Sequence, residues 1–181
     1  MKVIFVAGIH AVGKSAMCEV VSKELEIPYY TASQIISTEK SSAISKGSKL
    51  VANVTDNQNL LIKGVSKILG NKDFLLDGHF TIRRQGDREI ERIDVEVFSA
   101  LHLAGILVIT DDPLQISMRM KIRDGIALPL DQIASHQTAE LTHAKAVASF
   151  LHIPCAELQA FDYEGMKITI KNWLKDTTTN Y

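Results

Sequence analysis

The chain has 181 residues, 46% of them hydrophobic, which suits one domain with a substantial core. Its 20 basic and 21 acidic residues leave a formal net charge of −1 at pH 7, so composition gives no general electrostatic reason to expect nucleic-acid binding. No apolar run is long enough to cross a bilayer, and we expect a cytoplasmic protein with no secretion signal and no disulfide between Cys18 and Cys155.

Apolar runs and segments of helical spacing alternate along the chain. The predicted strands, in chain order, are residues 2–7, 27–30, 73–78, 106–109 and 153–158. The predicted helices begin after the loop at residues 8–15 and then cover about 31–39, 55–69, 89–103, 113–123, 130–151 and 163–174. This β/α alternation predicts an α/β fold, with a parallel sheet and helices on both of its faces.

Residues 8–15 read Gly-Ile-His-Ala-Val-Gly-Lys-Ser and match the phosphate-binding pattern G-x-x-x-x-G-K-[ST] at every fixed position. They lie between a predicted strand and a predicted helix, which is the context that distinguishes a phosphate loop from a chance match. Gly8 and Gly13 allow backbone conformations that a side chain would forbid, so the loop N–H groups can converge on phosphate oxygens at the helix N-terminus. The alternative is a glycine-rich turn.

The residue types in this loop predict separate roles. Lys14 would reach the β- and γ-phosphates of ATP, and Ser15 would supply a hydroxyl to Mg²⁺. We expect His10 to contact phosphate through its backbone while its side chain points outward. The residues expected to bind ATP are Gly8, His10, Ala11, Val12, Gly13, Lys14, Ser15 and Ala16.

Asp77 lies near the end of a predicted strand, where an open parallel sheet places its ligands. A carboxylate there would hold Mg²⁺ through water or position an acceptor, so Asp77 is a candidate metal and catalytic residue. The alternative is a solvated aspartate at a strand end. His79 follows closely and is as consistent with a structural histidine as with a substrate contact.

Arg83, Arg84 and Arg88 cluster in the segment that follows. One of them is a candidate to clamp the phosphate of an acceptor, because the guanidinium matches phosphate oxygens. Three acidic residues lie in or directly after the same segment, so a surface ion-pair patch is the alternative.

Arg119 and Arg123 are four residues apart in the predicted helix that begins at Pro113, so they share one helix face. There they would neutralise charge on a phosphoryl group during its transfer, and we assign both as candidate catalytic residues together with Lys14 and Asp77. The alternative is a solvated basic stripe that suits the helix dipole. The linker at about 123–131 is expected to be a small lid that closes over the nucleotide.

Several segments occur in an order that is typical of one family: the first strand with its loop, Leu76 to His79, Asp112 to Arg119, Arg123-Asp124, and Ser135 to Gln137 before an alanine-rich helix. Together they resemble the nucleoside monophosphate kinases, in particular the archaeal-type adenylate kinases, over nearly the whole chain. The resemblance implies a three-layer α/β/α P-loop fold with a five-stranded parallel sheet. It also implies an acceptor-binding arm at about 31–70 and a lid within one domain, residues 1–181.

The same resemblance implies transfer of the ATP γ-phosphoryl group to a nucleoside monophosphate in the presence of Mg²⁺. Residues 8–15 would then hold the ATP phosphates, Asp77 would lie at the Mg²⁺ and acceptor side, and Arg119 and Arg123 would be lid arginines. The partners would be small-molecule nucleotides, without membrane or nucleic acid, and the protein would be a monomer or a small homo-oligomer.

The chain departs from this family at His10-Ala11, in a short lid without a further arginine, and in the arginine-rich segment after His79. These departures leave the acceptor open. A nucleoside monophosphate kinase is the first hypothesis. The alternatives are a kinase for a non-nucleotide metabolite, and an ATP- or GTP-binding ATPase or switch module that acts through a protein partner.

Overall fold

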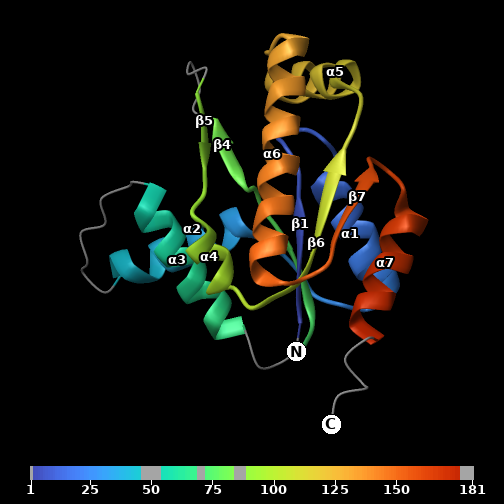
Figure 1. Cartoon of the computed structure of the whole chain (residues 1–181). Coiled ribbons are helices and arrows are strands. Elements are labelled where there is room, and N and C mark those ends of the chain that lie inside the picture. Colours follow the sequence, from blue (N-terminus) through green and yellow to red (C-terminus); the bar gives the residue numbers. More distant parts are fainter. Residues whose placement is uncertain (1, 46–53, 69–71, 84–88, 176–181) are drawn as a thin grey trace.

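Five parallel strands form the centre of the fold, in the order β2-β3-β1-β6-β7 (Figure 1). The computed structural model describes residues 2–45, 54–68, 72–83 and 89–175. The bounds of the five strands are β1 Val3–Ala7, β2 Tyr29–Thr31, β3 Phe74–Asp77, β6 Leu103–Thr110 and β7 Cys155–Gln159. The prediction of a five-stranded parallel sheet is confirmed.

β1 lies in the middle of the sheet, and all five of its residues are buried. Such a continuous apolar run suits a central parallel strand, because helices cover both of its faces. Val6 of β1 pairs with Asp77 of β3 on one side and with Leu107 of β6 on the other. This register brings the carboxyl ends of β1 and β3 to the same edge of the sheet, so the segment after β1 begins beside Asp77.

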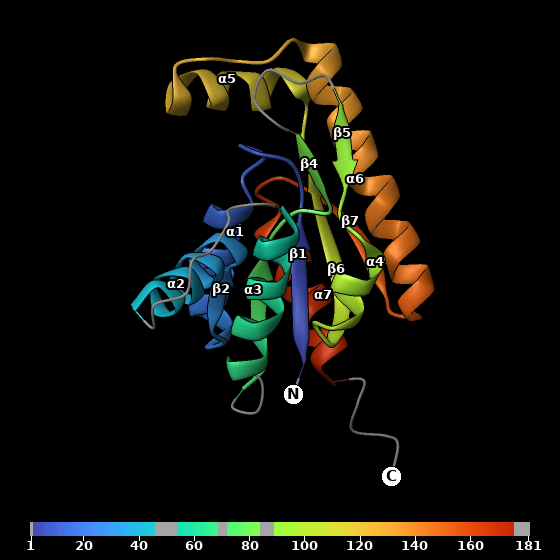
Figure 2. The same ribbon diagram turned by 90° about the vertical axis from the view of Figure 1, so that its left-hand side faces the viewer.

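Helices cover both faces of the sheet and make three layers (Figures 1 and 2). Helices α1, α7 and part of α5 pack on one face, whereas α3, α4 and most of α6 pack on the other, with α2 against α3. Their bounds are α1 Lys14–Leu25, α2 Ala32–Ser45, α3 Val54–Ile68, α4 Val95–Ser99, α5 Pro113–Asp124, α6 Leu130–Leu151 and α7 Tyr163–Lys175. The predicted three-layer α/β/α arrangement is confirmed.

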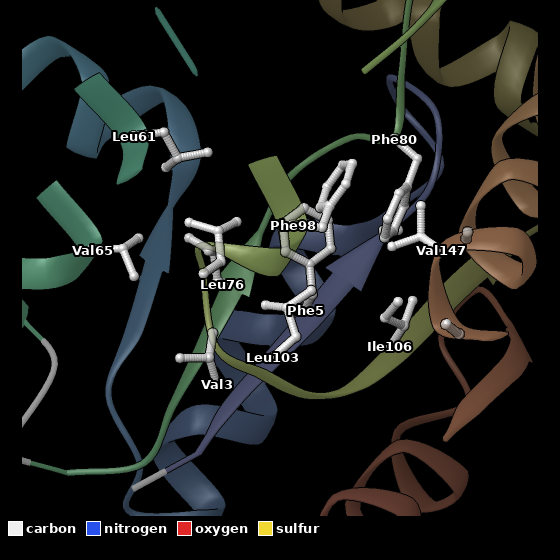
Figure 3. Close-up of a cluster of buried hydrophobic side chains, with 14 of the residues drawn as sticks. Val3, Phe5, Leu61, Val65, Leu76, Phe80, Phe98, Leu103, Ile106 and Val147 are labelled. Atoms are coloured by element: carbon white, nitrogen blue, oxygen red, sulfur yellow. The ribbon is translucent and has the colours of Figure 1, made fainter. Parts of the chain in front are cut away.

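A group of aromatic rings fills the core between the sheet and α6 (Figure 3). Phe5 of β1 meets Phe80 and Phe98 with ring centroids 5.0 and 5.6 Å apart, and Phe80 stacks on Phe98 at 4.3 Å. Edge-to-face and stacked aromatic pairs add to the stabilisation that burial alone provides. Phe80 therefore fixes the segment that directly follows β3.

Residues 89–103 do not form the single helix that their spacing predicts. β5 (Ile90–Arg92) pairs antiparallel with β4 (Thr81–Arg83), α4 follows, and Leu103 already belongs to β6. The prediction is wrong because a three-residue strand has too little periodicity to be recognised without its partner. Asp94 then caps α4, since its carboxylate accepts a hydrogen bond from the Glu96 N–H at 3.1 Å.

α2 begins where the sequence predicts, after Thr31, but it ends later. Its first turn carries a reciprocal cap, in which the Gln34 N–H donates to Thr31 Oγ1 at 3.1 Å and the Thr31 N–H donates to Gln34 Oε1 at 3.3 Å. The helix then continues to Ser45, beyond the predicted end at residue 39.

Across the described ranges, no helix combines the length and apolar character needed to cross a membrane.

A substitution at Gly105 would test how closely α7 packs against the sheet. A Cβ atom at this position in β6 would lie 2.4 Å from Cε3 of Trp173 in α7. We expect Gly105→Ala to lower the free energy of unfolding by about 1–3 kcal/mol through overpacking, as measured by urea denaturation. In a Trp173→Leu background the same substitution should cost clearly less. Equal costs in the two backgrounds would show that the Trp173 ring is not the obstacle.

Candidate active site

The segment between β1 and α1 has the backbone geometry that a phosphate loop requires. Gly8 and Gly13 have φ angles of 142° and 115°, which residues other than glycine rarely adopt. A Cβ atom on Gly8 would also lie 2.6 Å from the carbonyl oxygen of Ile109. Gly13 is the N-cap of α1, so the loop leads directly into the positive end of a helix.

Lys14 is buried at the first position of α1. Its Nζ donates to the carbonyl oxygens of Gly8 at 2.6 Å and Ile9 at 3.1 Å, and it lies 3.9 Å from Oδ1 of Asp77. Burial lowers the pKa of Lys14, while the negative charges of Asp77 and Glu140 oppose that shift. The carbonyl oxygens at the start of the loop thus bind the ammonium group of Lys14.

Asp77 is buried and accepts hydrogen bonds from two side chains, which excludes a solvated strand-end aspartate. Ser15 Oγ donates to its Oδ2 at 2.7 Å, and the Tyr29 hydroxyl donates to the same oxygen at 3.1 Å. Burial and, next, the charge of Asp77 raise the pKa of Tyr29 far above its usual value, so the phenol stays a donor. Among the described residues, no three His, Cys, Asp or Glu side chains gather as a metal cluster.

A cavity of about 520 Å³ opens over the loop. Its wall consists of residues 10–16, residues 31–33 at the start of α2, residues 77–79 after β3, and Arg119, Ile122 and Arg123 of α5. In Figure 2, α5 crosses above the end of the sheet from which the segment after β1 emerges. The cavity therefore lies where phosphate-loop, strand-end and α5 residues face one another.

Arg119 reaches from α5 back to the loop. Its Nε donates to the carbonyl oxygen of Ala11 at 2.8 Å, and its Nη2 donates to Oδ2 of Asp111 at 2.5 Å. The guanidinium also lies over the Phe161 ring, 5.4 Å from its centroid. These contacts fix the partly buried side chain of Arg119, so it is not part of a freely solvated stripe.

Gln137 of α6 binds the backbone of Asp111, whose carboxylate pairs with Arg119. The Asp111 N–H donates to Gln137 Oε1 at 3.0 Å, and Gln137 Nε2 donates to the Asp111 carbonyl at 2.9 Å. This paired contact fixes the backbone just after β6. Neither Asp111 nor Gln137 was a predicted site residue, although Gln137 belongs to a segment that carries the family resemblance.

His10 and Arg123 meet at the C-terminal end of α5. His10 Nε2 lies 2.8 Å from Oδ2 of Asp124, and Arg123 Nε lies 3.7 Å from Oδ1 of the same carboxylate. The His10 side chain therefore points away from the loop backbone, as expected, and contacts the C-terminal end of α5, where the predicted lid begins. Arg123 lines the cavity together with His10.

His79 lies in the cavity wall as a neutral imidazole. Burial, followed by the nearby charge of Lys14, lowers the pKa of His79 to about 3. Near neutral pH it therefore offers one donor and one acceptor and no charge.

Only one member of the predicted arginine cluster lies among the described residues. Arg83 belongs to β4, and its Nη2 donates to Oε1 of Gln132 in α6 at 2.5 Å. Arg83 does not line the cavity. Arg84 and Arg88 lie outside the described residues.

Glu140 is a further residue near this site that the sequence does not reveal. It lies in α6 with 1% of its surface exposed, and it contacts Gly8, Phe80 and Thr81 through hydrogen bonds. No motif surrounds it in the sequence. Only a glutamate on the mostly apolar buried face of α6 could have drawn attention to it.

A parallel five-stranded sheet with a glycine-rich phosphate loop after β1 defines a P-loop protein with the α/β fold of P-loop kinases. A family model described as "AAA domain" matches residues 7–136, and the chain belongs to this family. No curated protein matches the sequence.

Solved structures share the fold at low sequence identity. A gluconokinase from Sinorhizobium meliloti 1021 is 14% identical with a TM-score of 0.55, and the match covers 97% of this chain and 92% of that one. A sugar kinase from Janibacter sp. HTCC2649 is 15% identical with a TM-score of 0.56, covering 98% and 96%. An uncharacterized protein from Eubacterium ventriosum is 12% identical with a TM-score of 0.53, covering 98% and 99%. These similarities establish the fold.

The lowered pKa of His79 predicts how stability depends on pH. Between pH 6.5 and about 3 the unfolded imidazole binds a proton that the folded one does not, so the free energy of unfolding falls as the pH falls through this window. His79→Asn should make the loss of stability between pH 7.5 and pH 5 smaller than in the wild type, as measured by urea denaturation. His102→Asn, at an exposed histidine, is the control. An unchanged loss in His79→Asn would contradict the neutral imidazole.

Proposed function

We propose that the protein is an ATP-dependent small-molecule kinase. One observation carries this proposal: Lys14, the Ser15–Asp77 pair, Arg119 and Arg123 line the same cavity. Phosphoryl transfer depends on alignment and on positive charge around the γ-phosphate, and it requires no nucleophilic side chain. These five residues would supply both requirements.

The ATP phosphates would bind to the N–H groups of residues 8–16, with Lys14 against the β- and γ-phosphates. Ser15 and Asp77 present a hydroxyl and a carboxylate 2.7 Å apart, and oxygen donors of this kind fit Mg²⁺. When bound, Mg²⁺ neutralises charge on the phosphate oxygens. Ser15 and Asp77 would hold it, with Asp77 on the side of the acceptor.

Arg119 and Arg123 would stabilise the equatorial oxygens of the transferring phosphoryl group. Closure of a lid at residues 123–131 would exclude water and suppress hydrolysis. The lid, an acceptor-binding arm at 31–70 and a single domain over 1–181 are parts of this proposal.

A nucleoside monophosphate is the first acceptor that we propose. It follows from the resemblance to the archaeal-type adenylate kinases, and the start of the proposed arm lines the cavity. Arg84 or Arg88 would bind its phosphate. Arg83 is a weaker candidate, because its guanidinium is engaged by Gln132.

A hydroxylated, non-nucleotide metabolite is the second candidate. Thr31, Ser33, Asp77 and His79 line the cavity, and this set of hydroxyls, a carboxylate and a neutral imidazole suits an acceptor with several hydroxyl groups. Asp77 would accept the proton of the attacking hydroxyl. The gluconokinase and the sugar kinase that share this fold also support this candidate.

The acceptor is tested by measuring ATP consumption with magnesium across nucleoside monophosphates, sugars and sugar acids. We expect slow consumption without an acceptor and a strong increase with one acceptor class. An increase with a nucleoside monophosphate alone supports the first candidate, and one with a sugar or sugar acid alone supports the second. Rapid hydrolysis that no acceptor accelerates would replace the kinase proposal with an ATPase or switch.

Lys14 provides the sharpest test of the site. Lys14→Ala should lower kcat/KM by roughly 100- to 1,000-fold, the range seen when one preorganised group that stabilises transition-state charge is removed. Lys23→Ala is the matched control, because Lys23 lies on the same helix but is exposed and pairs with Glu19. Calorimetry with ATP and magnesium reports binding for each variant. Wild-type turnover in Lys14→Ala would defeat the proposed function.

A further inference from the structure

The carboxylate of Glu140 accepts four hydrogen bonds in the interior of the protein. Oε1 accepts from the N–H groups of Gly8 at 3.2 Å and Phe80 at 2.9 Å. Oε2 accepts from the N–H of Thr81 at 2.7 Å and from its Oγ1 at 2.5 Å. Three of the four donors are backbone N–H groups. Such groups cannot rotate toward another acceptor when the carboxylate is lost.

These hydrogen bonds join the two segments that bound the cavity. Gly8 begins the phosphate loop, and its carbonyl oxygen accepts from Lys14 Nζ at 2.6 Å. Phe80 and Thr81 directly follow residues 77–79, which form another wall of the cavity. One carboxylate on α6 therefore contacts both the loop that carries Lys14 and the segment that carries Asp77 and His79.

We propose that Glu140 is a positioning residue that sets the separation between the phosphate loop and the segment at residues 77–81. This inference rests on the proposed function and deepens it. ATP would lie on the loop and the acceptor against residues 77–79. In-line transfer requires the reacting atoms to approach to about 3–3.5 Å, so a shift of one segment against the other acts on the chemical step.

A buried carboxylate is a costly way to fill this space. An ionised group that leaves water loses its hydration, and only a full set of hydrogen bonds offsets that loss. The four donors supply such a set at defined positions. A purely packing role would be served by an apolar side chain of similar size, whereas a carboxylate orders three backbone N–H groups at once.

Helix α6 carries a second contact of the same kind on the same face. Gln137 lies three residues before Glu140 and binds the backbone of Asp111, whose carboxylate accepts from Arg119. α6 itself starts at Leu130, at the end of the predicted lid. One helix thus positions the loop, the segment on the acceptor side and a lid arginine relative to one another.

The test compares two ways of weakening the contact. Glu140→Gln keeps the size of the side chain but turns an NH₂ group toward the Thr81 donors, and we expect kcat to fall roughly 10- to 100-fold. MgATP affinity should fall by about threefold or more, because an amide displaced from the Thr81 donors also shifts its oxygen away from the Gly8 N–H. Thr81→Val removes one donor and should produce a smaller loss in the same direction, while Thr81→Ser restores the hydroxyl and should recover wild-type values.

Glu164→Gln is the charge-matched control, because Glu164 is an exposed residue of α7. All variants are assayed well below their melting temperatures, so that loss of folded protein cannot imitate loss of positioning. Wild-type kcat and MgATP affinity in Glu140→Gln, with only a lower melting temperature, would overturn the inference. If Glu140→Gln does not fold, the comparison of Thr81→Val with Thr81→Ser decides in the same way.

The experiment also separates this inference from the proposed function. If the wild type transfers phosphate to none of the acceptors, the proposed function fails, and the MgATP affinities alone decide on Glu140. Weaker MgATP binding in Glu140→Gln and Thr81→Val, with recovery in Thr81→Ser, would then still support its role in ordering the loop. Equal affinities in all variants would reject it.

Discussion

The parallel alignment of β1, β3 and β6 is the constraint on which the whole site depends. Because these strands point the same way and pair side by side, their carboxyl ends lie at one edge of the sheet. The loop that follows β1 supplies N–H groups and Lys14, β3 ends with Asp77, and the segment after β6 begins with Asp111. Lys14 and Asp77 thus meet in one cavity, and Asp111 holds Arg119, which also lines it, without any long loop to bring them together.

Two buried carboxylates near Lys14 have different partners, and this difference separates their roles. Asp77 accepts from the hydroxyls of Ser15 and Tyr29, which can rotate and release an oxygen to a metal or an acceptor. Glu140 accepts mainly from backbone N–H groups, which cannot turn away without moving the chain. Asp77 is therefore suited to changes during a reaction cycle, whereas Glu140 is suited to keeping the framework constant. Both charges also favour the protonated state of Lys14 against the effect of its burial.

Sequence reasoning succeeds here where a feature depends on neighbouring residues. Local spacing predicts the phosphate loop and the central strand β1. It also predicts that Arg119 and Arg123 lie on one face of the same helix. It fails where a residue acquires its meaning from a distant partner. Glu140 is 132 residues from Gly8 and 59 from Thr81, so no local pattern marks it. Residues 89–103 were predicted as a helix for the same reason: β5 is defined by its pairing with β4. Arg83 is a candidate phosphate clamp by residue type, but its place in β4 and its hydrogen bond to Gln132 leave it outside the cavity wall.

Two departures from the adenylate kinase pattern, His10 in the loop and a short lid with few arginines, become one feature in the structure. His10 lies against Asp124, and Asp124 also lies near Arg123, so the loop contacts the helix end that carries a proposed catalytic arginine. The side chains of His10 and Asp124 are 47% and 41% exposed, and pairs this accessible to water contribute little stability. Under the proposed function, a weak contact of this kind would allow α5 to approach the loop and to separate from it again. His10 therefore gives the proposed lid a point of contact with the phosphate loop.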